Sequence, residues 1–445
     1  MRIRQIDAEG EEIRFRLDEP VRAQRIRLSA YLPALGEEAE VYTAGMSVDG
    51  DSFSIPRRLG GEDGLTLFYV AADENGEVPG VKYASPASSV RAHAPLAPGS
   101  CKGLAVEDGM AESALALGAR QAALNVNLGD FLLPYPQGSD TLFYRYGGRD
   151  WYIRAGAVRA LEEALRPLSA AGVPVILTLV NAPVWRWEVQ GAFWEKIRHP
   201  AYDGESGEAS LFDTVRGGGC RAFAAFVSFL AERYAREDAV CGRMDGMAIG
   251  YSVNCSGEWA NCGPCALPEF VQQYTAALRL TYQCAASVWK NIRIYAAVGQ
   301  CAGGAPDASR REFSGAALLD GIERLCAEEG DFPWRAICQV SPGELLDGEP
   351  PVSGAAGERC GNGVRRMLLS VQGFPTDGTP AGDERQAQEY LRTYHTVSAM
   401  PRVDGLIYES HTDHAEEGAL LGLLRRGEDG RCSERAAARV FRSLP

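Results

Sequence analysis

VPVILTLV, residues 173–180, is apolar nearly throughout and stands between a helical pattern and a long loop. Such strands are typical of parallel sheets, because helices cover both faces of the sheet and leave no side for polar residues. RMLLSV, residues 366–371, has the same character far along the chain. These two runs predict a parallel sheet in which each strand is followed by a helix.

The same order of strand and helix repeats from residue 101 to the end of the chain. The strand candidates are 102–106, 121–128, 173–180, 244–252, 292–299, 335–341, 364–372 and 404–410. An amphipathic pattern follows almost every one, and only the pattern after 335–341 is weak. Repeats of this kind and number predict a TIM (β/α)8 barrel. The alternative is an open doubly wound sheet, but the chain has no Gly-rich phosphate loop after an early strand.

The first part of the chain has a different pattern. Residues 1–70 alternate apolar and polar positions in short runs separated by turns such as VDGDS and GGEDG, which predicts a small antiparallel β domain. Residues 71–100 are rich in Pro, Gly, Ser and Ala and predict an extended connector. The barrel is therefore expected to occupy 101–445.

Charge and composition exclude some classes of partner. The net charge is −14 and the pI is near 5.0, whereas nucleic acids and anionic membranes are bound mainly through Lys and Arg. The N-terminal residues are charged where an export signal would be apolar, so a cytoplasmic location is expected. Most of the 12 cysteines are then expected to be reduced. The oligomeric state cannot be predicted from these features.

Aromatic residues gather in the long segments that follow the second, third and fourth strands. Trp185, Trp187 and Trp194 lie in the loop 181–217, and Trp259 follows the fourth strand. In a barrel these loops lie at the catalytic face. Exposed aromatic rings around a cleft suit sugars, whose C–H faces stack on them. The alternative is that these tryptophans pack the loops onto the barrel.

Five segments carry a resemblance to a known family. They are AALNVNLGDF (122–131), IRHPAYD (197–203), IGYSVNCSGEWANCG (249–263), MLLSVQGF (367–374) and GLIYESHTDHAEEGALLGL (405–423). In order and spacing they resemble an uncharacterised bacterial family, a domain of unknown function, of clan A glycoside-hydrolase-like TIM barrels. The resemblance covers roughly 65–425. It implies a sugar cleft with an acid/base Glu ending strand four and a nucleophile Glu ending strand seven.

The chain departs from this family at both expected carboxylates. The family segment IGNEVN reads IGYSVN here, which places Tyr251 and Ser252 where Asn and Glu are expected. LSEQGF reads LSVQGF, so Val371 stands at the expected nucleophile position, and IYHR reads IYES, which introduces Glu409. A serine hydroxyl is too weak an acid to protonate a glycosidic oxygen, and valine cannot act as a nucleophile. The resemblance therefore implies that standard retaining hydrolysis is lost.

Two other carboxylates are candidates for a relocated acid/base pair. Glu409 is expected at the end of strand eight, beside Val371, and Glu258 is expected in the loop over the cleft. The alternative makes Glu258 a solvated loop residue and Glu409 a hydrogen-bonding group at the strand end.

The candidate substrate-binding residues come from the strand ends and the loops after them. They are Asn125, Asn127, Asp130, Trp185, His199, Tyr251, Asn254, Trp259, Asn261, Gln372, Tyr408, His411 and Asp413. His411, Asp413 and His414 could bind a metal, but a structural or substrate-binding role is favoured. Cys255, Cys262 and Cys265 form half of a metal motif at most. We therefore expect neither a metal nor another cofactor.

Three hypotheses follow. The first is a carbohydrate-binding pseudoenzyme that retains the cleft of a glycosidase without its chemistry. The second is an enzyme that processes a glycan with relocated carboxylates such as Glu409 and Glu258. The third and weaker hypothesis is an assembly protein that acts through its N-terminal β domain.

Overall fold

The computed structural model describes residues 1–34, 39–87, 89–183, 188–204, 207–299, 311–341, 365–413, 420–427 and 429–445, the side chains of 188–192 excepted. The weak helical pattern expected after 335–341 lies outside the described residues. Within the described part of the chain, no helix combines the length and apolar character that crossing a bilayer requires.

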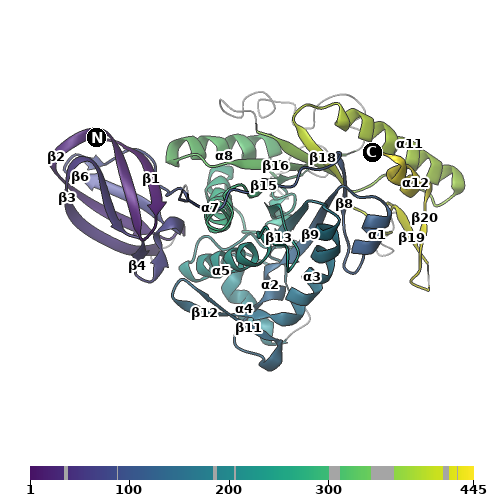
Figure 1. Ribbon diagram of the computed structural model, residues 1–445, viewed down its shortest axis with the longest axis horizontal. Coiled ribbons are helices and arrows are strands. Elements are labelled where there is room, and N and C mark those ends of the chain that lie inside the picture. Colours follow the sequence, from purple (N-terminus) through teal and green to yellow (C-terminus); the bar gives the residue numbers. More distant parts are fainter. Residues whose placement is uncertain are drawn as a thin grey trace.

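Eight parallel strands close into a barrel, which confirms the prediction and rules out the open sheet (Figure 1). In chain order they are β8 (Lys102–Ala105), β9 (Gln121–Asn127), β13 (Val175–Val180), β14 (Gly246–Ile249), β15 (Arg293–Val298), β16 (Trp334–Gln339), β17 (Met367–Val371) and β18 (Val403–Tyr408). Each strand pairs with its neighbours in sequence, and β18 pairs with β8 to close the circle. All the strand candidates of the sequence are therefore present.

Side chains of opposite parity on these strands enter two different cores. A small cluster inside the barrel joins Ile176, Ala248, Tyr295 and Leu368, with Ile337 against it. The alternate residues face outward and pack under the helices in the main core, as the period of two in a strand requires. This parity decides which strand-end residues can reach the barrel mouth.

Helices surround the barrel where the amphipathic patterns predict them, and three further helices, at 128–131, 188–197 and 256–259, lie in segments that were expected to be loops. The described helices are α1 (Ala111–Ala116), α2 (Leu128–Phe131), α3 (Ala155–Ala170), α4 (Glu188–Ile197), α5 (Gly217–Tyr234), α6 (Ser256–Trp259), α7 (Leu267–Ala286), α8 (Gly315–Glu329), α11 (Pro380–Ser398) and α12 (Ala436–Ser443). The segment after β9 is not the plain loop that the sequence suggests. It folds into a small antiparallel sheet of β10 (Leu132–Leu133), β11 (Thr141–Tyr146) and β12 (Arg149–Arg154).

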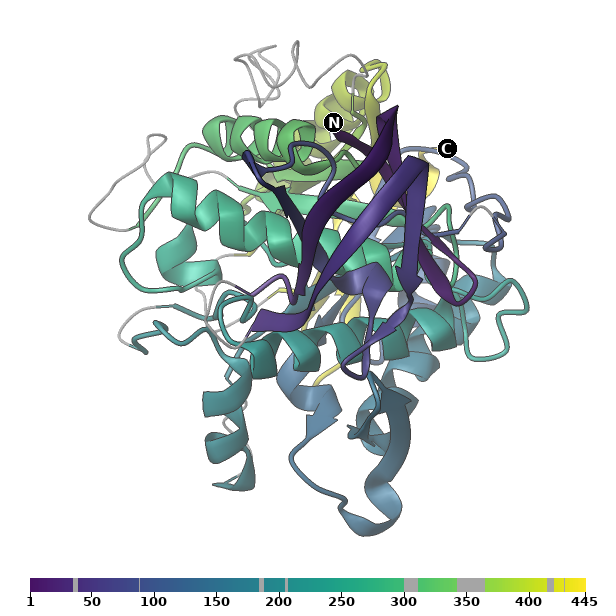
Figure 2. The same cartoon turned by 90° about the vertical axis from the view of Figure 1, so that its left-hand side faces the viewer.

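The N-terminal residues form the expected antiparallel sheet, which packs beside the barrel against its teal and green helices (Figure 2). Its strands are β1 (Ile3–Glu9), β2 (Glu12–Tyr31), β3 (Glu40–Pro56), β6 (Phe68–Asp73) and β7 (Gly76–Glu77), with a hairpin of β4 (Arg58–Leu59) and β5 (Glu62–Asp63). The boundary predicted at residue 70 falls inside β6. We propose instead that the connector begins after Glu77.

The connector is fastened to the barrel rather than free. The Trp289 indole donates to the His93 carbonyl at 2.8 Å, and the two rings stack with centroids 4.5 Å apart. The Leu96 amide donates to Asp245 Oδ1 at 2.9 Å, just before β14. The sheet itself contacts the barrel through Glu62, whose carboxylate pairs with Arg221 of α5 at 2.6 Å.

Candidate functional site

A cavity of about 430 Å³ lies at the C-terminal ends of the barrel strands. Every barrel strand contributes to its wall, and two loops add Glu208 and Trp259. In TIM barrels this is the end at which binding and catalytic groups gather. The polar and aromatic residues of the wall are Asn125, Thr178, Glu208, Tyr251, Ser252, Trp259, Gln339, Ser370, Gln372, Glu409 and Ser410.

Glu409, at the end of β18, is the centre of a hydrogen-bonded cluster in this cavity. Its Oε2 accepts a hydrogen bond from the Tyr251 phenol and another from Gln339 Nε2, the latter at 2.9 Å. The other end of the Gln339 amide accepts from Ser252 Oγ at 2.9 Å. Groups from strands four, six and eight are thus joined across the barrel mouth.

Burial governs the ionisation of this cluster. Desolvation raises the pKa of Glu409, although hydrogen bonds from Ser370, Tyr251 and Gln339 oppose the rise. Burial also raises the pKa of the Tyr251 phenol, and the nearby Glu409 charge adds to the effect. The Tyr251 phenol therefore stays protonated and donates to Glu409. The Glu409 carboxylate accepts this hydrogen bond and binds a proton more readily than an exposed glutamate does.

The turn after β14 presents Tyr251 and Ser252 to the cavity in an unusual backbone conformation. Ser252 has a φ of 41° and Gly250 a φ of 77°, both in the left-handed region, where a non-glycine residue is strained. A Cβ on Gly299 would lie 2.2 Å from Ser252 Oγ, so only glycine leaves room for this side chain. Ser252 is accordingly only 3% exposed, and a longer side chain at this position would be crowded.

Trp259 forms the aromatic side of the cavity. It ends the short helix α6, and its ring meets the edge of the Tyr251 ring with centroids 4.9 Å apart and planes at 72°. The indole is partly exposed while Tyr251 is held by Glu409. The pair leaves an aromatic surface open to the cavity.

The end of β17 differs from the expectation. Ser370 and Gln372 line the cavity, so the intervening Val371 points to the opposite side of the sheet and is fully buried under the helices. Its strand neighbour Tyr408 also points outward, where its phenol donates to the Leu421 carbonyl at 2.6 Å. The expectation that Val371 and Tyr408 face the cleft is therefore wrong, because both side chains point away from the barrel interior and towards the helices.

Three predicted asparagines brace loops instead of lining the cavity. Asn254 donates to the carbonyls of Gly299 and Phe313 at 2.9 and 3.1 Å and accepts from the Gly299 amide. Asn261 donates to Asp203 at 2.9 Å. Asn127 exchanges hydrogen bonds with the backbone of Ala182 at 3.0 and 3.2 Å.

Asn125 is the predicted asparagine that does reach the cavity, where its side chain is exposed. It also lines an adjoining cavity of about 700 Å³ between β8, β9 and α3, which shares Glu409 and Val180 with the first. The predicted Asn127 and Asp130 also line this second cavity, and Asp130 pairs with Arg154 at 3.1 Å. The two cavities are neighbours at the barrel mouth, because they share lining residues.

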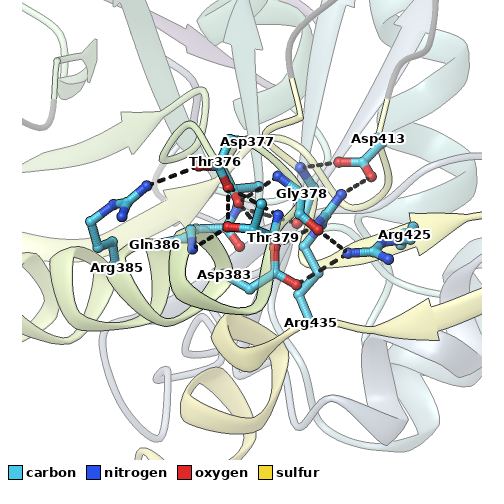
Figure 3. A network of polar contacts seen from close by, with 12 residues as sticks. Thr376, Asp377, Gly378, Thr379, Asp383, Arg385, Gln386, Asp413, Arg425 and Arg435 are labelled. Atoms are coloured by element: carbon cyan, nitrogen blue, oxygen red, sulfur yellow. Dashed lines mark hydrogen bonds and ion pairs between the residues drawn. The ribbon is translucent and has the colours of Figure 1, made fainter.

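The predicted histidines and Asp413 are buried in supporting structure. His199 is 3% exposed and His411 is fully buried, and burial lowers the pKa of each imidazole to about 4. Asp413 accepts hydrogen bonds from the buried Arg435 and from the Gly422 amide (Figure 3). None of the three lines the cavity. Trp185 and His414 lie outside the described residues.

The candidate partner carboxylate Glu258 is exposed and does not line the cavity. Its backbone carbonyl instead accepts from the amides of Glu208 and Ala209 at 2.7 and 3.1 Å. Through these bonds the loop presents Glu208 to the cavity. Glu208 could not be predicted from the sequence, because no pattern marks its position in the loop. Gln339 could have been predicted, because it lies two residues after Ile337 on strand six and so faces the same side of the sheet.

Within the described ranges, no group of three His, Cys, Asp or Glu residues is placed to hold a metal ion. The cavity can therefore offer to a ligand an aromatic surface, amide groups, hydroxyls and the carboxylates of Glu208 and Glu409.

The closed parallel barrel with a polar and aromatic cavity at its strand ends is a TIM barrel. The chain belongs to a family of unknown function, DUF5722, whose model matches residues 95–339 and 355–445. The membership in a family of unknown function that the five sequence segments indicate is thereby confirmed. No curated protein matches the sequence.

Several solved structures are similar to the barrel at low identity. One is GH5_18 from Streptomyces cattleya in complex with GlcNAc, with 17% identity, a TM-score of 0.47, and coverage of 75% of this chain and 72% of that chain. A second is Fpglu1 from Fervidobacterium pennivoraus, with 11% identity, a TM-score of 0.49, and coverage of 75% and 81%. A third is a family 1 β-glucosidase from Thermotoga maritima in complex with isofagomine lactam, with 10% identity, a TM-score of 0.45, and coverage of 74% and 84%.

Proposed function

We propose that this protein binds a carbohydrate in the cavity at the barrel mouth and lacks the standard retaining hydrolysis of clan A glycosidases. The observation that carries the proposal is the joint presence, in one cavity, of the Trp259 ring, the exposed amides of Asn125 and Gln372, and the Glu409 carboxylate. Sugar recognition needs an apolar surface for the ring face and fixed polar groups for the hydroxyls.

The charge of the wall favours a neutral sugar. Among the described residues that line the cavity there is no Lys, Arg or His, whereas Glu208 and Glu409 are both present. A uronic or sialic acid would bring its carboxylate towards these two groups without a cation to offset the repulsion. A neutral hexose or N-acetylhexosamine would meet only donors and acceptors.

The groups needed for standard retaining hydrolysis are not at their expected places. The end of strand four offers Tyr251 and Ser252, and the end of strand seven offers Ser370 and Gln372. None of these can serve as a carboxylic acid or a carboxylate nucleophile. General acid catalysis alone is worth about 10²–10⁴-fold, so a bound glycoside would be hydrolysed slowly by this pair of positions.

One observation favours a second candidate, an enzyme with relocated carboxylates. Glu409 and Glu208 line the same cavity, and burial raises the pKa of Glu409, as in general acids tuned to work near neutral pH. In this candidate Glu208 takes the part first assigned to Glu258, because Glu258 does not line the cavity.

A panel of neutral oligosaccharides tests both candidates. Binding is measured by calorimetry and turnover by release of reducing ends, for the wild type and for Trp259→Ala, Glu409→Gln and Glu208→Gln. The control is Glu258→Gln, which removes a neighbouring exposed carboxylate. We expect binding that Trp259→Ala abolishes and Glu258→Gln leaves unchanged, with no turnover.

Turnover that is lost in Glu409→Gln and retained in Glu258→Gln would establish the second candidate instead. Absence of binding to every member of the panel would contradict both. Binding of acidic oligosaccharides in preference to neutral ones would contradict the neutral class while leaving the cavity as the site.

A further inference from the structure

Two thiols outside the cavity lie next to each other in the segment that joins α6 to α7. Cys262 and Cys265 belong to the sequence CGPC, and their sulfur atoms are 3.3 Å apart. A disulfide requires an S–S distance of about 2.05 Å, which the two side chains can reach by small rotations.

The two thiols have different surroundings. Cys262 is 2% exposed, whereas Cys265 is partly exposed and lies two residues before Leu267, the first residue of the 20-residue helix α7. The hydrogen bond from Cys262 lowers the pKa of Cys265, and the nearby Arg311 charge acts in the same direction. The pKa of Cys262 is raised because it holds the shared proton and is buried. The accessible sulfur is therefore the one of the two that ionises more readily.

The turn that holds the pair is fixed by its neighbours. Gly263 has a φ of +69°, and a Cβ there would lie 2.6 Å from the Ala201 carbonyl oxygen, so the turn requires glycine. The Gly263 amide donates to Asn261 Oδ1 at 3.0 Å, and Asn261 is itself held by Asp203 and Arg311. The fold thus holds the two sulfurs next to each other without a covalent bond between them.

We propose that Cys262 and Cys265 form a redox-active dithiol, which converts to an intramolecular disulfide by exchange with a low-molecular-weight disulfide such as oxidised glutathione. A metal site is disfavoured, because among the described residues no group of three His, Cys, Asp or Glu side chains that includes the pair is placed to hold a metal ion. The inference is independent of the carbohydrate proposal, although the pair stands only three positions beyond Trp259 in the chain.

The exchange proceeds in two steps. First, Cys265 loses its proton, and the thiolate attacks one sulfur of the small disulfide, forms a mixed disulfide and expels the other half as a thiolate, which takes up that proton. Second, Cys262 loses its proton, attacks Cys265 Sγ and expels the remaining half as a second thiol. The protein loses two hydrogens, and one small disulfide is reduced to two thiols.

The test uses the full chain equilibrated in buffers with a series of ratios of reduced to oxidised glutathione. The samples are quenched in acid, alkylated and mapped by mass spectrometry. We expect Cys262 and Cys265 to become protected together, with a mass loss of two hydrogens in their peptide, at ratios that leave the exposed Cys432 alkylated. The reaction should reverse on addition of dithiothreitol.

Two single variants separate the steps. In Cys262→Ser the second step is impossible, so Cys265 should retain one glutathione as a stable mixed disulfide. In Cys265→Ser, Cys262 should remain an unmodified thiol. The proposal is overturned if both wild-type thiols stay alkylatable wherever Cys432 is already modified, or if wild-type Cys265 accumulates glutathione without closing on Cys262. The wild-type measurement decides the matter even if a variant fails to fold.

Discussion

Glu409 is a carboxylate that the fold holds in a partly buried position with two donors on one oxygen. Desolvation raises its pKa, which means that its charged form is disfavoured in the folded protein. Binding sites often contain a residue of this kind, whose burial lowers the stability of the folded protein but places a polar group where a ligand can reach it. The same residue that weakens the fold is therefore the one expected to hold a ligand.

The first prediction concerns Glu409→Gln. This change keeps the size of the side chain and removes the charge that burial disfavours, so we expect the free energy of unfolding to stay equal or rise. Glycan binding should weaken by tenfold or more, because a charged acceptor makes the stronger hydrogen bond. Urea unfolding and calorimetry measure the two effects. A variant that loses stability and keeps full binding would contradict this role.

The second prediction separates the two parities at the end of β17. Val371→Glu places a carboxylate in the apolar layer under the helices and should destabilise the fold by about 4 kcal/mol. Gln372→Glu is its matched control, because residue 372 is exposed in the cavity, and should change stability by less than about 1 kcal/mol. Equal urea midpoints for the two variants would show that Val371 does not face the core.

At the scale of elements, one buried arginine joins three segments around strand eight. Arg435, at the start of α12, is 1% exposed, and its guanidinium pairs with Asp383 of α11 at 2.6 Å and with Asp413 after β18 (Figure 3). Thr376 and Arg425 contact the same Asp383 carboxylate at 3.0 and 3.3 Å. This network holds the loop after β18 and, through it, the end of the strand that carries Glu409.

The third prediction is that Arg435→Met destabilises the protein by about 3–5 kcal/mol, because it leaves the buried Asp413 carboxylate without its cation and removes one of the two guanidinium groups that pair with Asp383. The control is Arg236→Met, which breaks the exposed pair of Arg236 and Asp238 and should change stability by less than about 1 kcal/mol. Thermal or urea unfolding of both variants provides the comparison. Similar losses for the two changes would show that the network is no more than a surface contact.

At the scale of the whole molecule, the two buried histidines link stability to pH. Burial lowers the pKa of His199 and His411 from 6.5 to about 4. Above pH 6.5 both are neutral in the folded and unfolded states and contribute nothing. Between pH 6.5 and about 4 these two imidazoles bind protons in the unfolded chain but not in the folded protein. The free energy of unfolding therefore falls as the pH falls.

The fourth prediction follows from this difference in proton uptake. Each histidine should account for a loss of about 3 kcal/mol between pH 6.5 and pH 4. His411→Gln should therefore show a shallower decline of the unfolding free energy over this window than the wild type. His395→Gln, on the exposed side of α11, is the matched control for loss of one imidazole. Parallel declines in the wild type and His411→Gln would contradict the assignment.

The fold could be predicted because its signal is repeated along the chain. Apolar runs such as 173–180 require cover on both faces, and eight strand-and-helix units leave few architectures other than a closed barrel. The cavity could be predicted only in part. Tyr251, Trp259, Gln372 and Glu409 line it as expected, whereas Val371 has the opposite parity, which depends on the register of β17 within the barrel. Glu208 reaches the cavity through loop contacts that leave no pattern in the sequence.

The most direct test of the central proposal is a crystal structure of the protein soaked with a neutral oligosaccharide. The account predicts a sugar ring in the cavity at the barrel mouth, with one face against Trp259 and a hydroxyl hydrogen-bonded to Glu409. An empty cavity at saturating oligosaccharide, or a sugar bound elsewhere on the molecule, would contradict it.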